Sequence, residues 1–297
     1  MIEVSHLTKT YGNVTAVEDV SFTVPDGEVT AFLGNNGAGK STTMRMILGL
    51  DHPNSGEARI DGKLYKEIEN PIQTVGSLLD AHAINPKRNA YDHLKIISVA
   101  SGLDGNNIDE LLKLVGLYED RKRPIGQFSL GMHQRLGIAT ALLGDPTHVI
   151  LDEPTNGLDP DAIKWVRSVM SDMAKSGKSV LVSSHHLAEV AYIADNIVII
   201  DEGHIKHKST IQELHTQYDH NGCLVDSNYK HDLEAALKAN NMKYTVMQDG
   251  KLSVNHKDSG HIGQIATQNN IPLTHLEHVS TSLEDIFFTI TGKVSGI

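Results

Sequence analysis

The sequence predicts an α/β fold with a mostly parallel sheet, followed by a small α+β domain. Two observations predict it. Short apolar runs alternate with helical patterns along residues 1–218, and from residue 222 the pattern restarts as strand, helix, strand, strand, helix and strand. Strands that alternate with helices form parallel sheets, whose ligands bind beyond the carboxyl ends of the strands. We therefore expect two domains, at residues 1–218 and 222–297.

The first domain begins with strands and a glycine-rich loop. Residues 17–24 alternate apolar and polar side chains, as a half-buried strand does, and Pro25-Asp26-Gly27 is a turn into the apolar strand VTAFLG. A glycine-rich loop then precedes a helix that begins near Lys40. Residues 86–145 have a helical pattern, which we interpret as an inserted helical subdomain.

Buried strands and helices alternate in the rest of the chain. Residues 148–151 are an apolar run typical of a buried strand, residues 161–175 are helical, and SVLVSS and IVII are further buried strands. The segment from residue 222 has the order of the split βαββαβ unit. We expect this second domain to have a ferredoxin-like fold.

Composition excludes several classes of protein. The chain of 297 residues has 26 Lys and Arg against 37 Asp and Glu, and its formal charge of −11 argues against a nucleic-acid-binding surface. One cysteine, Cys223, excludes an internal disulfide framework and fits a reducing compartment, so the cytoplasm is the default. The sequence shows neither a secretion signal at its start nor an apolar run long enough to span a bilayer.

The glycine-rich loop is a phosphate-binding motif. GNNGAGKST matches G-x-x-x-x-G-K-[ST] between a predicted strand and a predicted helix, a context that a glycine-rich turn with an accidental Lys-Ser would lack. Its backbone N–H groups and the helix N-terminus favour a triphosphate. Lys40 is expected on the β- and γ-phosphates, and Ser41 is expected on Mg²⁺. The expected nucleotide-binding residues are Gly34, Asn35, Asn36, Gly37, Ala38, Gly39, Lys40, Ser41 and Thr42.

A pair of carboxylates ends the apolar strand of HVILDEP. Asp152 is placed to hold Mg²⁺, and Glu153 is placed to orient or deprotonate an attacking water. Alone, the pair could equally cap a helix start before Pro154. Combined with the phosphate-binding loop, it predicts hydrolysis of a bound nucleoside triphosphate, with ATP and Mg²⁺ as cofactors.

These two motifs, with FSLGMHQRL between them, resemble the ATPases of ABC transporters over roughly residues 1–215. The resemblance implies that Ser129 and Gly131 form the signature loop, which contacts the γ-phosphate bound to an opposite subunit. The common L-S-G-G-Q of that family reads F-S-L-G-M here, so only these two residues carry over. By itself, Ser129 could be an ordinary helix N-cap.

The same resemblance assigns three further residues. Asp159 in NGLD lies where the family has its D-loop at the dimer interface, and His185 in SSHH lies where the family has its switch histidine. We choose His185 over His186 because the pattern SSH-x-L-x-E-V aligns through Leu187. Tyr11 in KTYG resembles the aromatic residue that stacks on adenine, although a core or surface tyrosine is the alternative.

Asp80 departs from the family. It follows VGSLL where many ABC ATPases have glutamine and antibiotic-immunity relatives often have glutamate, so we expect it to bind Mg²⁺ directly or through a water. The alternative is that Asp80 only caps a loop turn beside Ala81.

The resemblance also implies partners. A complete site needs a head-to-tail pair, formed with a second copy or a paralogue, and a separate integral membrane permease that holds the ATPase at the inner face of the plasma membrane. TTMRMILGL, VGSLLDAHAINP and SLEDIFFTITG point to bacitracin-resistance and lantibiotic-immunity exporters of drugs or peptides. The rival readings are a cytosolic ABC protein that remodels nucleic acid or ribosomes, and a P-loop kinase. The single phosphate-binding loop disfavours the first, and the signature segment disfavours the second.

Overall fold

The computed structural model describes residues 1–81, 83–185, 192–218, 222–247, 249–254, 258–279 and 283–292. The chain forms two compact units, the first essentially Met1–Ile211 and the second essentially Gln212–Thr289. The first unit has two sheets and the second unit has one, and each unit has its own core. Within the described residues, no helix is both long and apolar enough to cross a membrane.

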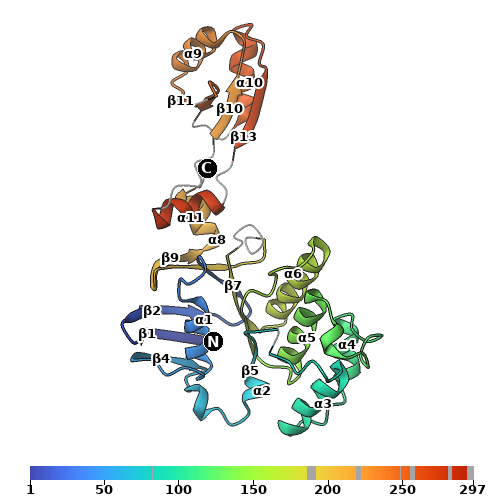
Figure 1. Ribbon diagram of the computed structural model, residues 1–297. Helices are drawn as coiled ribbons and strands as arrows, with labels where there is room; N and C mark the ends of the chain where they lie inside the picture. The colour runs from blue at the N-terminus through green and yellow to red at the C-terminus, as the bar shows by residue number, and fades with distance from the viewer. Residues whose placement is uncertain are drawn as a thin grey trace. The chain divides into compact units, whose positions relative to one another are not determined.

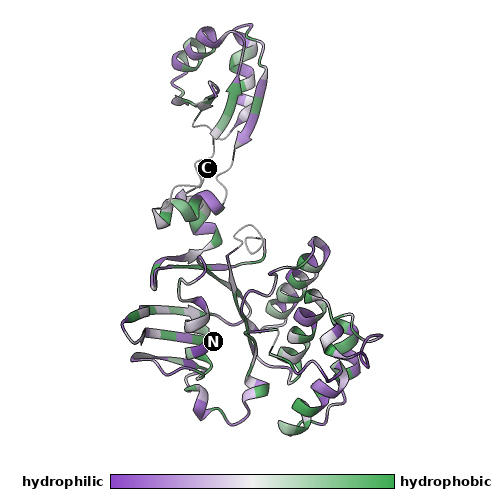
Figure 2. Cartoon of the chain, viewed as in Figure 1, coloured by the Kyte–Doolittle hydropathy of each residue, from purple (hydrophilic) through white to green (hydrophobic). Residues whose placement is uncertain are grey.

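A six-stranded sheet forms the centre of the first unit (Figure 1). The strand order is β5, β6, β7, β3, β8, β9; the first five strands are parallel, and β9 is antiparallel to β8. Every residue of β3, β6 and β7 is buried, which explains why apolar residues dominate these strands. The edge strand β9 is mostly hydrophilic (Figure 2). The bounds are Val75–Leu78 (β5), His148–Leu151 (β6), Ser179–Ser184 (β7), Val29–Leu33 (β3), Asn196–Asp201 (β8) and His204–Thr210 (β9).

A three-stranded antiparallel sheet, in the order β2, β1, β4, forms a second layer. Helix α1, Lys40–Ile47, packs between the two sheets: its Met44 and Ile47 share a core with Phe22 of one sheet and Phe32 of the other. Burial of this apolar face fixes the helix that follows the glycine-rich loop. The strands are Ile2–Tyr11 (β1), Val14–Val24 (β2) and Ser55–Ile60 (β4).

The remaining helices of this unit include three within residues 86–145, the range with the helical pattern. Three helices begin at residues whose side chains accept an N–H of the first turn: Asn89 before α3, Ser129 before α5 and Asp159 before α6. The bounds are Pro71–Thr74 (α2), Ala90–Ala100 (α3), Ile108–Leu114 (α4), Leu130–Leu142 (α5) and Pro160–Lys175 (α6), with 3₁₀ turns at Tyr65–Glu67 and Ile125–Gln127.

Helix α5 touches strand β5 backbone to backbone. A Cβ atom on Gly76 of β5 would clash with the carbonyl oxygen of Ala141 in α5, so only glycine permits this approach. The contact lies near the C-terminal end of α5, whose N-terminal end begins after Ser129.

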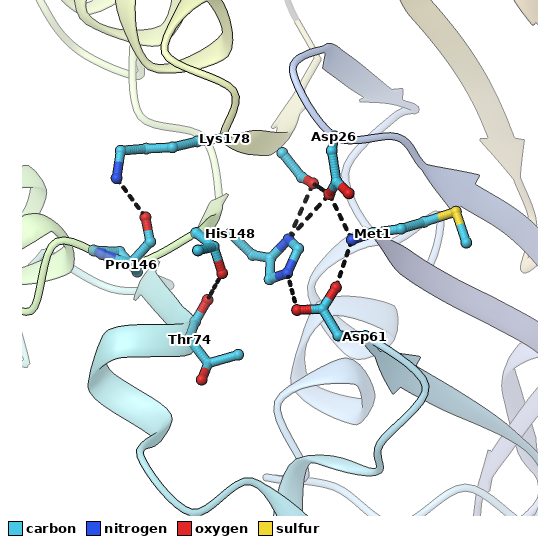
Figure 3. A network of polar contacts seen from close by, with 9 residues as sticks. Met1, Asp26, Asp61, Thr74, Pro146, His148 and Lys178 are labelled. Atoms are coloured by element: carbon cyan, nitrogen blue, oxygen red, sulfur yellow. Dashed lines mark hydrogen bonds and ion pairs between the residues drawn. The ribbon is translucent and has the colours of Figure 1, made fainter.

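A polar network surrounds the buried His148 at the start of β6 (Figure 3). His148 is 1% exposed; its Nδ1 is 3.0 Å from Oγ of Ser179, and its Nε2 is 2.9 Å from Oδ2 of Asp61. Ser179 donates its only hydroxyl proton to Oδ1 of Asp26 at 2.6 Å, so it accepts from Nδ1–H. Asp61 lies on the other ring nitrogen, so both nitrogens of His148 have a polar partner.

The same network joins the two sheets of the first unit. The amine of Met1, ahead of β1, donates to Asp26 at 2.5 Å and to Asp61 at 2.7 Å. The pKa of Asp26 is lowered by hydrogen bonds from this amine and from Ser179. Partial burial acts to raise the pKa of Asp61, but hydrogen bonds from the amine and from His148 outweigh it, and the net shift is downward.

The second unit has a four-stranded antiparallel sheet in the order β11, β12, β10, β13. Numbered from the start of this unit, the order is 2-3-1-4, which confirms the predicted ferredoxin-like βαββαβ fold. Helices α9 and α10 and the two central strands form its core, which includes the buried thiol of Cys223. The bounds are Gly222–Asp226 (β10), Lys230–Ala239 (α9), Tyr244–Val246 (β11), Leu252–Val254 (β12), Ser259–Gln268 (α10) and His275–Val279 (β13), with flanking helices Ile211–Tyr218 (α8) and Leu283–Thr291 (α11).

Candidate active site

The glycine-rich loop, residues 34–42, connects the buried strand β3 to the start of α1. Gly39 precedes α1 with φ 111°, and a Cβ atom there would lie 2.7 Å from the carbonyl oxygen of Ala16, so the loop requires glycine at this position. A cavity of about 160 Å³ opens above the loop. Its lining residues are Ala16, Asn36, Gly37, Gly39, Lys40, Ser41, Thr42 and Glu153.

Lys40 is held inside this loop. Its side chain is only 5% exposed, and its Nζ donates to the carbonyl oxygens of Gly34 at 2.7 Å and Asn35 at 3.3 Å. Nζ also lies 3.1 Å from Oε1 of Glu153, in an ion pair that lacks hydrogen-bond alignment. The loop thus presents a buried positive charge to the cavity, as binding of a polyphosphate requires.

Glu153 bridges Lys40 and His185. The Oε2 atom of Glu153 is 2.7 Å from Nδ1 of His185 and 3.4 Å from its backbone N. A carboxylate only accepts, so Nδ1 carries hydrogen. The backbone of Glu153 is left-handed, with φ 48°, a conformation that costs a non-glycine residue roughly 1–2 kcal/mol. A charged carboxylate in a strained backbone, next to a lysine and a histidine, is typical of a catalytic position.

Asp152 is the first residue beyond β6. Its backbone N donates to the carbonyl oxygen of Leu78 at 2.7 Å, which fixes it beside the end of β5. Its Oδ1 accepts a short hydrogen bond from the hydroxyl of Ser183 in β7, and the same hydroxyl accepts from the N–H of Glu153 at 2.9 Å. Sequence reasoning gave Ser183 no role, although two adjacent serines that end an apolar strand were a signal.

The oxygen donors expected for Mg²⁺ come from neighbouring elements. Leu78 of β5 pairs with Leu151 of β6, so Asp80 and Asp152 follow adjacent strand ends. Asp80 is exposed, and its backbone carbonyl accepts from Ala83 at 3.3 Å. Ser41 is exposed in the first turn of α1. A hydroxyl and two carboxylates are hard oxygen ligands, a donor set that fits Mg²⁺.

Tyr11 lies at the end of β1, with its side chain 46% exposed. Its hydroxyl donates to Oδ2 of Asp51 at 2.8 Å, and this hydrogen bond raises the pKa of Tyr11. Nζ of Lys9 lies 5.0 Å from the ring centroid, in a cation–π contact. Stacking of Tyr11 on adenine therefore remains a prediction.

The signature and D-loop residues lie at the starts of α5 and α6 and do not line the cavity at Lys40. Ser129 accepts the N–H of Met132 at 3.3 Å, and Asp159 accepts the N–H of Ala162 at 2.8 Å. A Cβ atom on Gly131 would lie 3.5 Å from the side chain of Leu158. None of Ser129, Gly131 and Asp159 is among the residues that line the cavity at Lys40. The structure thus brings Lys40, Asp152, Glu153 and His185 together and places the other three elsewhere. His186 lies outside the described residues.

A phosphate-binding loop between a buried parallel strand and a helix, with an acidic pair at the end of a neighbouring strand, defines a P-loop nucleoside triphosphatase. Residues 17–156 match the family described as "ABC transporter". The bacitracin transport ATP-binding proteins BcrA of Enterococcus faecalis and Bacillus licheniformis are 34% and 36% identical over 98% of this chain, and the matches cover 96% and 97% of those proteins. The chain therefore belongs to the ATP-binding proteins of ABC transporters, and it is an ATPase subunit.

Other matches differ in how much of the chain they cover. The lantibiotic transport ATP-binding protein SrtF of Streptococcus pyogenes is 40% identical over 69% of this chain and 89% of its own length. A solved ATP-binding subunit of an ABC transporter has a TM-score of 0.67 at 32% identity, over 73% of this chain and 93% of that one. CbiO1 of Clostridium perfringens, part of the ABC transporter complex cbiONQ, has a TM-score of 0.64 at 26% identity, over 80% and 94%. Residues 222–284 match a domain of unknown function, DUF8746.

Proposed function

We propose that this ATPase powers the export of an antibiotic, a drug or a peptide through a separate integral membrane permease. The full-length similarity to bacitracin transport proteins supports the substrate class, because it extends across both units of the chain. The shorter match to a lantibiotic transport protein supports the same class. In this assembly the chain lies at the inner face of the plasma membrane, held there by the permease.

The active form is a head-to-tail pair around two ATP molecules, formed with a second copy or a paralogue. Ser129 and Gly131 lie at the N-terminus of α5, where N–H groups can bind an anion, and they are absent from the lining of the cavity at Lys40 in their own chain. A γ-phosphate bound at Lys40 of one subunit would meet this helix end of the other. The separation of Ser129 and Gly131 from the cavity at Lys40 within one chain is the observation that supports the head-to-tail pair.

The hydrolytic step is transfer of the γ-phosphoryl group to water. Lys40 and the loop amides hold the phosphates, and Glu153 accepts the proton of the attacking water as the bond to ADP breaks. His185, bonded to Glu153, contacts the γ-phosphate as a polar sensor. Ser41, Asp152 and Asp80 would hold Mg²⁺, which when bound neutralises charge on the β- and γ-phosphates.

Oε1 of Glu153 lies 3.1 Å from Nζ of Lys40. A phosphate bound at Nζ would compete with this carboxylate for the one ammonium proton that the carbonyl oxygens of Gly34 and Asn35 leave over. We therefore expect bound ATP to turn Glu153 toward the attacking water. The charge of −11 and the single P-loop argue against nucleic acid as a partner.

A resistance assay tests the export proposal. The chain, co-expressed with a permease encoded beside it in a susceptible bacterium, should raise the minimal inhibitory concentration of bacitracin or of a purified lantibiotic. A Lys40→Ala chain, expressed at the same level, should give no protection, because the P-loop loses its buried charge. If the wild-type pair protects against neither class while hydrolysing ATP, the proposed cargo is wrong.

A further inference from the structure

Ser183 links the two carboxylates of the site from the neighbouring strand. The side chain is 0% exposed in β7. Its hydroxyl has one proton, which it donates to Oδ1 of Asp152, and its oxygen accepts the N–H of Glu153 at 2.9 Å. One buried hydroxyl thus donates to Asp152 and accepts from Glu153, the two consecutive residues that follow β6.

This link solves a geometric problem. Successive side chains of a strand point to opposite faces, so two consecutive carboxylates cannot serve one site in regular strand geometry. The backbone pairing of β6 with β7 ends at Leu151 and Val182, and Glu153 then turns into the left-handed region with φ 48°. Its N–H, now outside the ladder, is satisfied by Ser183.

We propose that Ser183 is a positioning residue that gives the two carboxylates their separate roles, a proposal that rests on the hydrolytic function proposed above. At Asp152 its proton fixes the rotation of the carboxylate and occupies Oδ1, while Oδ2 makes no hydrogen bond within the described residues and is available as a cation ligand. At Glu153 its oxygen holds the backbone that carries the side chain to Lys40 and His185.

The chain contains a matched control. Ser179 lies at the other end of the same strand and is also 0% exposed. Its hydroxyl also has two partners, here the side chains of His148 and Asp26. It has no contact with Asp152 or Glu153 among the described residues. Loss of the Ser179 hydroxyl reports the cost of removing a buried hydroxyl from β7 without touching the site.

The experiment uses the full chain with Ser183→Ala, Ser183→Thr, Ser183→Val and Ser179→Ala. Threonine and valine have nearly the same shape, so their difference isolates the hydroxyl from any overpacking. We would measure ATP turnover, the Mg²⁺ concentration at half-maximal turnover, and the affinity for a fluorescent ADP with Mg²⁺ and with EDTA. The ADP affinity reports on the cation site without any catalytic step.

The Ala and Val variants should bind ADP in EDTA like wild type. Their gain in ADP affinity on adding Mg²⁺, and their kcat, should each fall about 10–100-fold, as for other residues that orient metal ligands. Ser183→Thr should restore most of both, and Ser179→Ala should change neither.

Two results would overturn the proposal. Equal behaviour of the Thr and Val variants would show that the hydroxyl is not what matters. The same loss in Ser179→Ala would show that the effect is general to the packing of β7. A wild-type chain that binds Mg²⁺ and ADP but never hydrolyses ATP would instead contradict the hydrolytic function itself.

Discussion

At both ends of strand β6 a buried serine of β7 forms a hydrogen bond to a polar side chain, but the two ends differ in what else these polar groups contact. At the start, His148 bonds to Ser179 of β7; at the end, Asp152 bonds to Ser183 of β7. The start is closed, because both nitrogens of His148 have partners inside the protein. The end is open, because Glu153 faces a cavity and is matched to Lys40 only by an ion pair without hydrogen-bond alignment.

This difference teaches how one strand can serve both stability and chemistry. Buried polar groups that form hydrogen bonds with each other make a structure rigid. Polar groups that lack a full set of hydrogen bonds within the protein can instead form them with a ligand. Changes at the start of β6 should therefore alter unfolding, and changes at its end should alter turnover.

The largest expected effect is at the open end. Glu153→Gln should lower ATP turnover about 100-fold or more, because the amide keeps the shape of the side chain but cannot accept the proton of water. ATP binding should persist and an ATP-bound dimer should accumulate, which size-exclusion chromatography with ATP would detect. Asp161→Asn, at an exposed carboxylate in the first turn of α6, is the control. Normal turnover in the Gln variant would remove Glu153 from the role of base.

Next in size is the closed end. His148→Leu removes one buried and one partly buried hydrogen bond. Each is worth about 0.5–1.5 kcal/mol, and more where a charge is involved, so stability should fall by roughly 1–3 kcal/mol. The thermal midpoint should drop by several degrees, because about 1 kcal/mol shifts a unit of this size by roughly 2–4 °C. Turnover per folded molecule should match wild type. A large loss of turnover at an unchanged midpoint would break the division between the two ends.

A smaller effect should appear in the pH dependence of stability. The lowered pKa of Asp26 means that its contribution is present above the ordinary carboxyl pKa of about 3.9 and disappears as pH falls through the native value. Asp26 is largely exposed, so Asp26→Asn should lower the thermal midpoint by only about 1–2 °C at pH 7. That difference from wild type should shrink below about pH 4. A difference that grows on acidification would contradict the sign.

The smallest effect concerns Asp80, the exposed residue after β5. If it contributes to the cation site, Asp80→Ala should raise the Mg²⁺ concentration at half-maximal turnover about 2- to 3-fold, as expected for one partly solvated oxygen ligand. Permease-stimulated hydrolysis should also weaken. If neither the Mg²⁺ concentration at half-maximal turnover nor the stimulation by the permease changes, Asp80 is only a turn residue. The cation site would then consist of residues from the end of β6 and from the P-loop.

Much of the fold was predictable because its signals are local. Residues 148–151 and 179–184 are buried on both faces, so their apolar runs identify them as strands. The second unit has separate strands and helices of ordinary length in the ferredoxin-like order. The P-loop was predictable because glycine spacing and its lysine are fixed by backbone geometry around phosphate.

The rest depends on contacts between residues far apart in the chain. The two serines that end the strand of residues 179–184 indicate a polar contact there, but they do not identify Asp152, 31 residues away, as the partner of Ser183. His148, one of 17 histidines, was counted only as the first residue of an apolar run, yet it is bonded to Asp61, 87 residues away. Tyr11 was assigned through the family alone, and its bond to Asp51 could not be read from KTYG.

The glycine contact between β5 and α5 makes the helix a lever. Because Gly76 of β5 has no side chain, the carbonyl oxygen of Ala141 in α5 lies directly against the backbone of β5. The other end of α5 begins after Ser129. At 1.5 Å of rise per residue the arm from Ala141 to Ser129 is about 18 Å long, so a tilt of about 10° at the fulcrum moves Ser129 by about 3 Å. A rotation of α5 that is too small to disturb the sheet can therefore make or break a hydrogen bond at Ser129.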